Sequence, residues 1–217
     1  MGQFPNLTYV VRQRVTVPRH LERYERWMNE EQIPLLSSRI PELAGVRRYR
    51  EEKEELVFLT FYDFRPDVSW TPSTRAATRQ IREAWYAFAP DMRDFSGRLY
   101  SRIWSDGEGP RGAAPHPIIV EYLTLLAHKE DEWNRWSEQL WVRELRDLPI
   151  ADVQRYWALE GDPRFYLQIQ EFEDEPTMRR KIKESEPATR PDYWSGWAEW
   201  MPYVENLGRY VFHPIVD

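Results

Sequence analysis

The chain contains no cysteine and only four histidines among its 217 residues. The lack of cysteine excludes disulfides, thiolate nucleophiles and cysteine-ligated metals. The motifs HExxH and GxSxG are absent, as are a glycine-rich phosphate loop and any cluster of histidine and acid at metal-ligand spacing. We therefore expect no metal and no bound cofactor. The absence of cysteine is also consistent with a cytoplasmic location, which we take as the default.

The sequence also lacks a long apolar run and an excess of positive charge. No stretch approaches the roughly 18 apolar residues that a membrane helix needs. The formal net charge is −6, and the arginines are interspersed with Asp and Glu, so that no basic face forms. The composition thus disfavours both a membrane protein and a nucleic-acid-binding protein.

Aromatic residues are abundant, with 11 Trp, 12 Tyr and 9 Phe. Such side chains bury large areas, so most of them are expected to fill a core. A subset of them is also suited to line a pocket for a flat, apolar ligand.

The second half of the chain repeats landmarks of the first half in the same order. The spacing between paired landmarks varies by only a few residues, which indicates two related structural units. The pairs are Tyr24-x-Arg26-Trp27 with Trp133-x-Arg135-Trp136, Trp85-x-x-Phe88-x-Pro90 with Trp197-x-x-Trp200-x-Pro202, and Gly97-Arg98 with Gly208-Arg209.

Each unit has the pattern strand, helix, strand, strand, helix, strand. The expected elements are 7–17, 19–37, 45–51, 55–64, 74–95 and 98–104, then 117–126, 129–146, 152–158, 164–172, 176–204 and 208–215. This βαββαβ order predicts an α+β fold of two ferredoxin-like repeats, residues 1–104 and 117–217, joined by a Gly- and Pro-rich linker at 105–116. Packed sheet to sheet, the repeats would complete a pseudo-dimeric α/β barrel within one chain, with further homodimerisation left open.

The segment "WMNEEQIPLL" (27–36) and the run Gly45-Val46-Arg47-Arg48-Tyr49 resemble the dimeric α/β-barrel superfamily, and within it the EthD-like branch. Gln32 stands where such relatives usually carry histidine, and Trp141 occupies the equivalent position in the second unit. The resemblance implies a choice among cofactor-independent monooxygenases, polyketide cyclases, lyases and isomerases. Tandem members of the superfamily include haem enzymes that resemble chlorite dismutases.

The first helix places Gln32 on its inward face, because Leu21, Tyr24, Met28, Gln32 and Leu35 follow helical spacing. A buried amide must find partners, so Gln32 either bonds a backbone carbonyl or contacts a ligand. The second half carries the bulkier Trp141 at the position equivalent to Gln32. This difference predicts that the first half keeps a ligand cavity and that the Trp141 side chain fills the equivalent space in the second half.

The first strand presents Arg12, Arg14 and Thr16 on one face and Gln13 on the other. In the second unit, Tyr122 and Thr124 oppose Glu121. Buried arginines need counter-charges, which an Arg–Glu pair across the pseudo-twofold would supply. The alternative is a site for an anion or carboxylate.

These patterns select a set of site residues and a class of function. The predicted catalytic residues are Gln32, Tyr49, Arg14 and Arg12, and the predicted substrate-binding residues are Trp27, Met28, Trp85, Phe88 and Gln13. Because glutamine cannot act as a base, proton transfer would fall to Tyr49, to an acid or to a water.

The expected function is a cofactor-independent cyclase, dehydratase, isomerase or lyase that acts on a small hydrophobic, aromatic or polyketide-like molecule. The alternatives are a cofactor-free monooxygenase of the same fold, a non-catalytic binding protein for small hydrophobic ligands, and a haem enzyme resembling chlorite dismutases.

Overall fold

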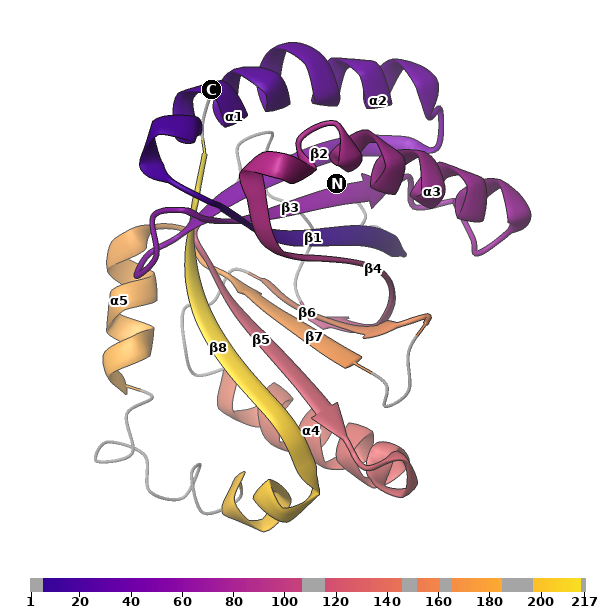
Figure 1. Ribbon diagram of the computed structural model, residues 1–217. Coiled ribbons are helices and arrows are strands. Elements are labelled where there is room, and N and C mark those ends of the chain that lie inside the picture. The colour runs from indigo at the N-terminus through magenta and orange to yellow at the C-terminus, as the bar shows by residue number, and fades with distance from the viewer. Residues whose placement is uncertain (1–5, 107–115, 146–151, 161–164, 185–196, 216–217) are drawn as a thin grey trace.

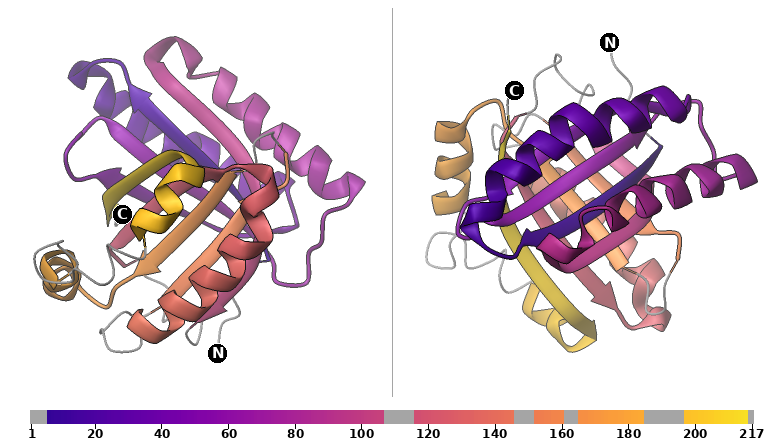
Figure 2. Two further views of the ribbon diagram at one scale, coloured as in Figure 1. Left: turned by 90° about the horizontal axis from the view of Figure 1, so that it is seen from below. Right: turned by 45° about the horizontal axis from the view of Figure 1, so that its top comes forward.

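The computed structural model describes residues 6–106, 116–145, 152–160, 165–184 and 197–215. Eight antiparallel strands form a closed barrel in the order β1-β3-β2-β8-β5-β7-β6-β4, with helices on its outside (Figures 1 and 2). The strands are β1 (Leu7–Val15), β2 (Leu43–Glu51), β3 (Val57–Phe64), β4 (Met92–Asp106), β5 (Ile118–Leu125), β6 (Asp152–Ala158), β7 (Phe165–Glu171) and β8 (Val204–Pro214).

Each half contributes one four-stranded sheet of ferredoxin-like order. The first sheet runs β4-β1-β3-β2, the second runs β8-β5-β7-β6, and the pairs β2–β8 and β4–β6 join them. This arrangement confirms the predicted α+β fold and the pseudo-dimeric α/β barrel that is completed within one chain. The barrel has an inner face, filled largely by apolar side chains, and an outer face covered by the helices.

The helices that cover the first half are α1 (Leu21–Arg26), α2 (Ile33–Arg39) and α3 (Pro72–Tyr86), and those of the second half are α4 (Glu130–Leu145) and α5 (Glu175–Glu184). A six-residue π-helical segment, Trp27–Gln32, joins α1 to α2. Pro34 explains this segment, because it cannot donate a hydrogen bond to the carbonyl four residues earlier. The N–H of Ile33 instead donates to the carbonyl of Met28, five residues back. None of the helices in the described ranges is long and apolar enough to cross a membrane.

The π-helical segment changes which residues of the first helix face the sheet. Met28 and Gln32 are buried as predicted, but Leu35 is 39% exposed and Leu36 is buried in its place. The predicted inward position of Leu35 is therefore wrong, because the wider turn before it delays the inward face by one residue.

One predicted helix ends earlier than expected. The helix predicted at 74–95 ends at Tyr86, and β4 already begins at Met92. Pro90 has no N–H to donate to the carbonyl of Tyr86, four residues earlier, which accounts for the early end. Of the helix predicted at 176–204, the described residues show α5 up to Glu184 and helix again at 197–200, residues 185–196 lie outside the description, and β8 begins at Val204.

Strand register gives the spatial equivalence of the two halves. Val10 lies opposite Arg98 in the first half, and Val120 lies opposite Tyr210 in the second. Arg98 is therefore equivalent to Tyr210, so the predicted alignment of Gly97-Arg98 with Gly208-Arg209 is wrong by one residue. That difference places Arg98 inside the barrel and Arg209 outside it.

Candidate functional site

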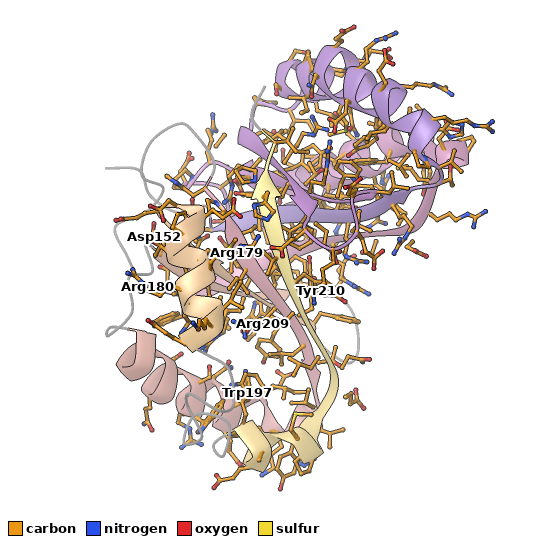
Figure 3. The ribbon with its side chains drawn as sticks, turned by 90° about the vertical axis from the view of Figure 1, so that its left-hand side faces the viewer. Asp152, Arg179, Arg180, Trp197, Arg209 and Tyr210 are labelled. Atoms are coloured by element: carbon orange, nitrogen blue, oxygen red, sulfur yellow. The ribbon has the colours of Figure 1, made fainter. Side chains whose placement is uncertain are left out.

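Four polar residues form a row across the outer face of the second sheet. Register places Arg209 beside Glu121, Glu121 beside Gln168, and Gln168 beside Arg155, on β8, β5, β7 and β6. We call these four residues the polar row. Adjacent strands lie about 4.8 Å apart, so Glu121 and Arg155 are separated by roughly 10 Å along the sheet. Figure 3 shows Arg209 and Tyr210 on opposite sides of β8, with Arg209 toward α5.

Glu121 is a buried carboxylate, 5% exposed, in the middle of the sheet. The amide nitrogen Nε2 of Gln168 donates to its Oε2 at 2.9 Å, and Nε of Arg209 lies 3.4 Å from its Oε1. Burial raises the pKa of Glu121, and the nearby charges of Arg209, Lys181 and Arg155 partly oppose that rise. A carboxylate with a raised pKa is suited to accept and return a proton.

Arg155 lies at the other end of the polar row and is 2% exposed. Within the described part of the chain, neither of its terminal nitrogens Nη1 and Nη2 has a hydrogen-bond partner. Its guanidinium lies 5.5 Å from the ring centroid of Trp104. Burial lowers the pKa of Arg155 to about 10, so the side chain is still a cation at neutral pH. A buried cation with free donors is suited to hold an oxyanion.

A cluster of indoles borders the polar row on the same outer face. Trp133 lies 4.9 Å from Trp136, 5.2 Å from Trp197 and 5.3 Å from Trp200, measured between ring centroids. The same cluster includes Leu123 and Tyr166, which are two residues along their strands from Glu121 and Gln168. The site therefore combines a carboxylate, a cation and a flat apolar wall.

The equivalent row of the first half lacks a carboxylate. Register places Val11, Thr60 and Arg48 at the positions of Glu121, Gln168 and Arg155. Arg48 is already bound by Asn29 and Glu25, both from the first helix. The two halves thus differ at these positions, and the carboxylate of this row lies in the second half.

The structure brings several of the residues selected from sequence together on the outer face of the first half. Trp27 lies 5.3 Å from Trp85 and 4.9 Å from Phe88, and all three contact the ring of Tyr24. Gln13 donates to the hydroxyl of Tyr24 at 2.5 Å.

Met28 and Gln32 are buried in the same layer. Among the described residues, neither polar atom of the Gln32 amide has a partner. A role for Gln32 in substrate binding stays a prediction. The side chain of Trp141, its counterpart in the second half, lies outside the described residues.

The other predicted catalytic residues face the inside of the barrel, so the sheet separates them from Gln32. Arg12 pairs with Glu51 at 3.2 Å, and Arg14 contacts Glu54 and Asp94. The predicted Arg–Glu pairing across the pseudo-twofold is wrong, because Arg12 and Glu51 both belong to the first half. In the second half, Glu121 likewise pairs with Arg209. The predicted faces of the first strand are confirmed.

Tyr49 is fully buried inside the barrel against Phe61. Burial raises its pKa, with Arg47 opposing the rise, so the phenol keeps its proton at neutral pH. Tyr49 can therefore donate a hydrogen bond but cannot serve as a base there.

Sequence reasoning did not select Arg155, Gln168 or Arg209. A signal was present, since Gln168 and Gln170 interrupt the otherwise apolar strand β7 at alternate positions. Alternation of this kind places both amides on one face of the strand.

The described residues do not fit a haem site. Nε2 of His213 lies 3.3 Å from Glu52 and its Nδ1 lies 3.8 Å from Glu175, so both ring nitrogens face carboxylates. His20 contacts Asp91, His116 contacts the carbonyl of Glu173, and His128 packs on Tyr203. No group of three His, Asp or Glu side chains that could hold a metal ion occurs in the described ranges.

No known protein-family profile matches the chain, and no curated protein matches it in sequence. Solved structures do match its fold. A monooxygenase candidate from Fusobacterium nucleatum superposes with a TM-score of 0.67 at 9% identity, over 100% of this chain and 94% of the other.

An anthrone oxidase-like protein gives a TM-score of 0.66 at 8% identity, over 97% of this chain and 91% of that one. A chlorite dismutase candidate gives a TM-score of 0.56 at 10% identity, over 97% of this chain and 94% of that one. At these identities the similarity establishes the ferredoxin-like α/β-barrel fold.

Proposed function

We propose that the chain is a cofactor-independent enzyme that removes a proton from a flat aromatic substrate at the polar row. The observation that carries this proposal is the placement of Glu121 and Arg155 on one buried face, with Gln168 between them. Their separation of roughly 10 Å along the sheet is comparable to the length of a fused ring system, which would lie over Gln168 with one end at the base and the other at the cation. The aromatic or polyketide-like nature of the substrate is supported by the adjacent indoles.

The proposed step begins with Glu121 ionised and held by Gln168 and Arg209. Its carboxylate takes a proton from an acidic C–H or O–H group of the substrate. The electron pair that remains spreads through the ring system to a carbonyl or phenol oxygen, which the free N–H groups of Arg155 stabilise. Return of the proton from Glu121 to another atom completes an isomerisation, and its transfer to a departing hydroxyl group, which leaves as water, completes a dehydration. In a cyclisation the substrate carbanion attacks a carbonyl carbon of the same molecule, and the resulting alkoxide takes the proton from Glu121.

A cofactor-free oxygenase is the second candidate, and it would share the first step. The substrate anion would react with dioxygen, so that a methylene group and O₂ give a carbonyl group and water. Fold neighbours described as monooxygenase candidates and as anthrone oxidase-like support this alternative. A non-catalytic binding protein would need Arg155 and the indoles but not the Glu121 carboxylate.

The origin of the barrel by tandem duplication, and its place in the EthD-like branch, belong to the same proposal. Equivalent aromatic contacts support duplication: the Trp27–Trp85 distance of 5.3 Å in the first half corresponds to 5.7 Å for Trp136–Trp197 in the second. The division into units 1–104 and 117–217 rests on the same correspondence.

Hydrogen–deuterium exchange between solvent and an acidic C–H group tests the proposal without knowledge of the natural substrate. Anthrone, a tricyclic ketone with an acidic methylene group, is incubated anaerobically with protein in D₂O, and NMR follows its deuteration. The wild-type protein should accelerate exchange, and Glu121→Gln should reduce that acceleration by at least about 100-fold.

Glu205→Gln is the matched control, because Glu205 is an exposed glutamate on β8. No acceleration by the wild type, or equal rates for the wild type and Glu121→Gln, would refute the proposal. Oxygen uptake under air, measured in parallel, separates the oxygenase from the proton-transfer enzyme.

A further inference from the structure

A second set of polar groups lies inside the barrel, on the opposite face of the sheets from the polar row. A cavity of about 300 Å³ opens at one barrel end between strands of both halves. We call it the barrel-mouth cavity, and six of its lining residues are Arg12, Arg98, Tyr100, Tyr122, Phe165 and Tyr210. Ser96 and Leu207 at its rim are exposed, so the cavity is open to solvent.

The opposite end of the barrel is closed by paired side chains. Asp63 accepts hydrogen bonds from Arg47 at 2.6 and 3.2 Å and from the hydroxyl of Thr8 at 2.9 Å.

The cavity carries an uncompensated positive charge. Arg12 is paired with the buried Glu51, and its guanidinium lies 4.9 Å from the ring centroid of Tyr210. Arg98 has no carboxylate partner among the described residues, and its guanidinium lies 3.7 Å above the ring centroid of Phe165. Stacking uses the flat face of a guanidinium and leaves its N–H edge free, which is the edge that binds carboxylates in a bidentate manner.

Phenol groups from both halves complete the lining. The hydroxyl of Tyr122 is buried and lacks a partner within the part of the chain that the structure describes. Burial raises the pKa of Tyr100 to about 12, with Arg98 opposing the rise, and also raises the pKa of Tyr122. Both phenols therefore keep their protons and can donate hydrogen bonds to an anion.

The two halves supply different groups at the same level of the barrel. Arg12 lies opposite Ser96, whereas Tyr122 lies opposite Gly208. Arg12 and Arg98 are thus equivalent to Tyr122 and Tyr210, whose rings pack edge to face at 6.1 Å. Gly208 permits this packing, because a Cβ there would lie 2.7 Å from the Tyr210 ring. The cavity is therefore cationic on the first-half side and aromatic on the second-half side.

We infer that the barrel-mouth cavity binds a small aromatic carboxylate, with the carboxylate on Arg98 and the ring against Tyr122 and Tyr210. Its volume lies at the low end of the range for ligand sites, about 300–1,000 Å³, which suits a single ring. Arg98, which lacks a carboxylate partner among the described residues, matches one negative charge. This site is separate from the polar row and does not rest on the proposed catalytic function.

Benzoate binding to the full chain tests the inference, with benzamide and inorganic phosphate as comparison probes. Calorimetry should show that the wild-type protein binds benzoate at least about tenfold more tightly than benzamide, because only benzoate offers a charge-assisted pair. It should also prefer benzoate to phosphate, which cannot use the aromatic side. Equal binding of benzoate and benzamide, or tighter binding of phosphate, would overturn the inference.

Variants locate the site. Arg98→Gln should weaken benzoate binding at least about tenfold, and Tyr122→Phe should weaken it several-fold by removing only the hydroxyl. The control Arg93→Gln removes the same charge from an exposed position on β4 and should leave affinity unchanged. Glu121→Gln should also leave it unchanged. Benzoate affinity that falls in Arg155→Met but not in Tyr122→Phe and Arg98→Gln would place the ligand at the polar row instead.

Discussion

Arg155 and Arg48 occupy equivalent positions in the two halves but have different surroundings. Arg48, 4% exposed, is bound by Asn29 and Glu25. Arg155, 2% exposed, has free terminal nitrogens with respect to the described residues. A buried cation without a matched partner lowers the stability of a fold, and such groups are typical of functional sites.

Arg155→Met should therefore stabilise the protein while it removes activity. Methionine fills a similar volume without a buried charge, and the expected gain in the free energy of unfolding is about 1–3 kcal/mol. Urea denaturation measures the stability, and anthrone exchange measures the activity.

Arg48→Met is the matched comparison for this change. It should destabilise the protein by about 1–3 kcal/mol, because Glu25 loses a charge-assisted hydrogen bond. A large loss of stability in Arg155→Met would show that Arg155 has a structural role.

At the scale of elements, the first helices of the two halves differ in their geometry. The first half contains the π-helical segment Trp27–Gln32, whereas the second half has the uninterrupted helix α4. A π-helical segment is equivalent to one inserted residue in an α-helix. Removal of one exposed residue between Met28 and Gln32 should therefore restore a regular α-helix. The inward residues Tyr24, Met28, Gln32 and Leu36 would then be four, three and four positions apart, which is the spacing of one helix face.

Deletion of Glu31 should accordingly leave the melting temperature within a few degrees of the wild type and should preserve anthrone exchange. Activity is expected to persist because the polar row lies in the other half. Loss of exchange with an intact fold would instead support the prediction that Gln32 contacts the substrate.

Deletion of Glu83 in α3 is the control, since this helix has no inserted residue. It would turn the buried Trp85 by about 100° and should lower the melting temperature by about 10 °C.

At the scale of the whole molecule, the sequence predicts the barrel because its signals are local and repeated. The βαββαβ order follows from apolar alternation and from proline- and glycine-marked turns, and the repeated Trp landmarks indicate two units. Local signals also explain the errors. Pro34 widens the first helix and Pro90 ends α3, because each lacks an N–H group. A prediction from apolar periodicity alone takes no account of these missing donors.

The candidate site is less accessible to sequence reasoning. Arg209, Glu121, Gln168 and Arg155 come from four separate strands, and only the register of the closed sheet aligns them. A single-residue shift in register would send each side chain to the other face. The same uncertainty explains the one-residue error of the predicted alignment, since Arg98 is equivalent to Tyr210 and not to Arg209.

The central claim is that Glu121 accepts the substrate proton, and the pH dependence of anthrone exchange tests it most directly. Exchange should rise with pH as Glu121 loses its proton, with a midpoint above the ordinary glutamate value of 4.5, because burial raises its pKa. Arg209 stabilises the charged carboxylate, so Arg209→Gln should move the midpoint to higher pH, whereas Arg179→Gln on α5 should not. A midpoint that is unchanged in Arg209→Gln, or a rising limb that persists in Glu121→Gln, would contradict the account.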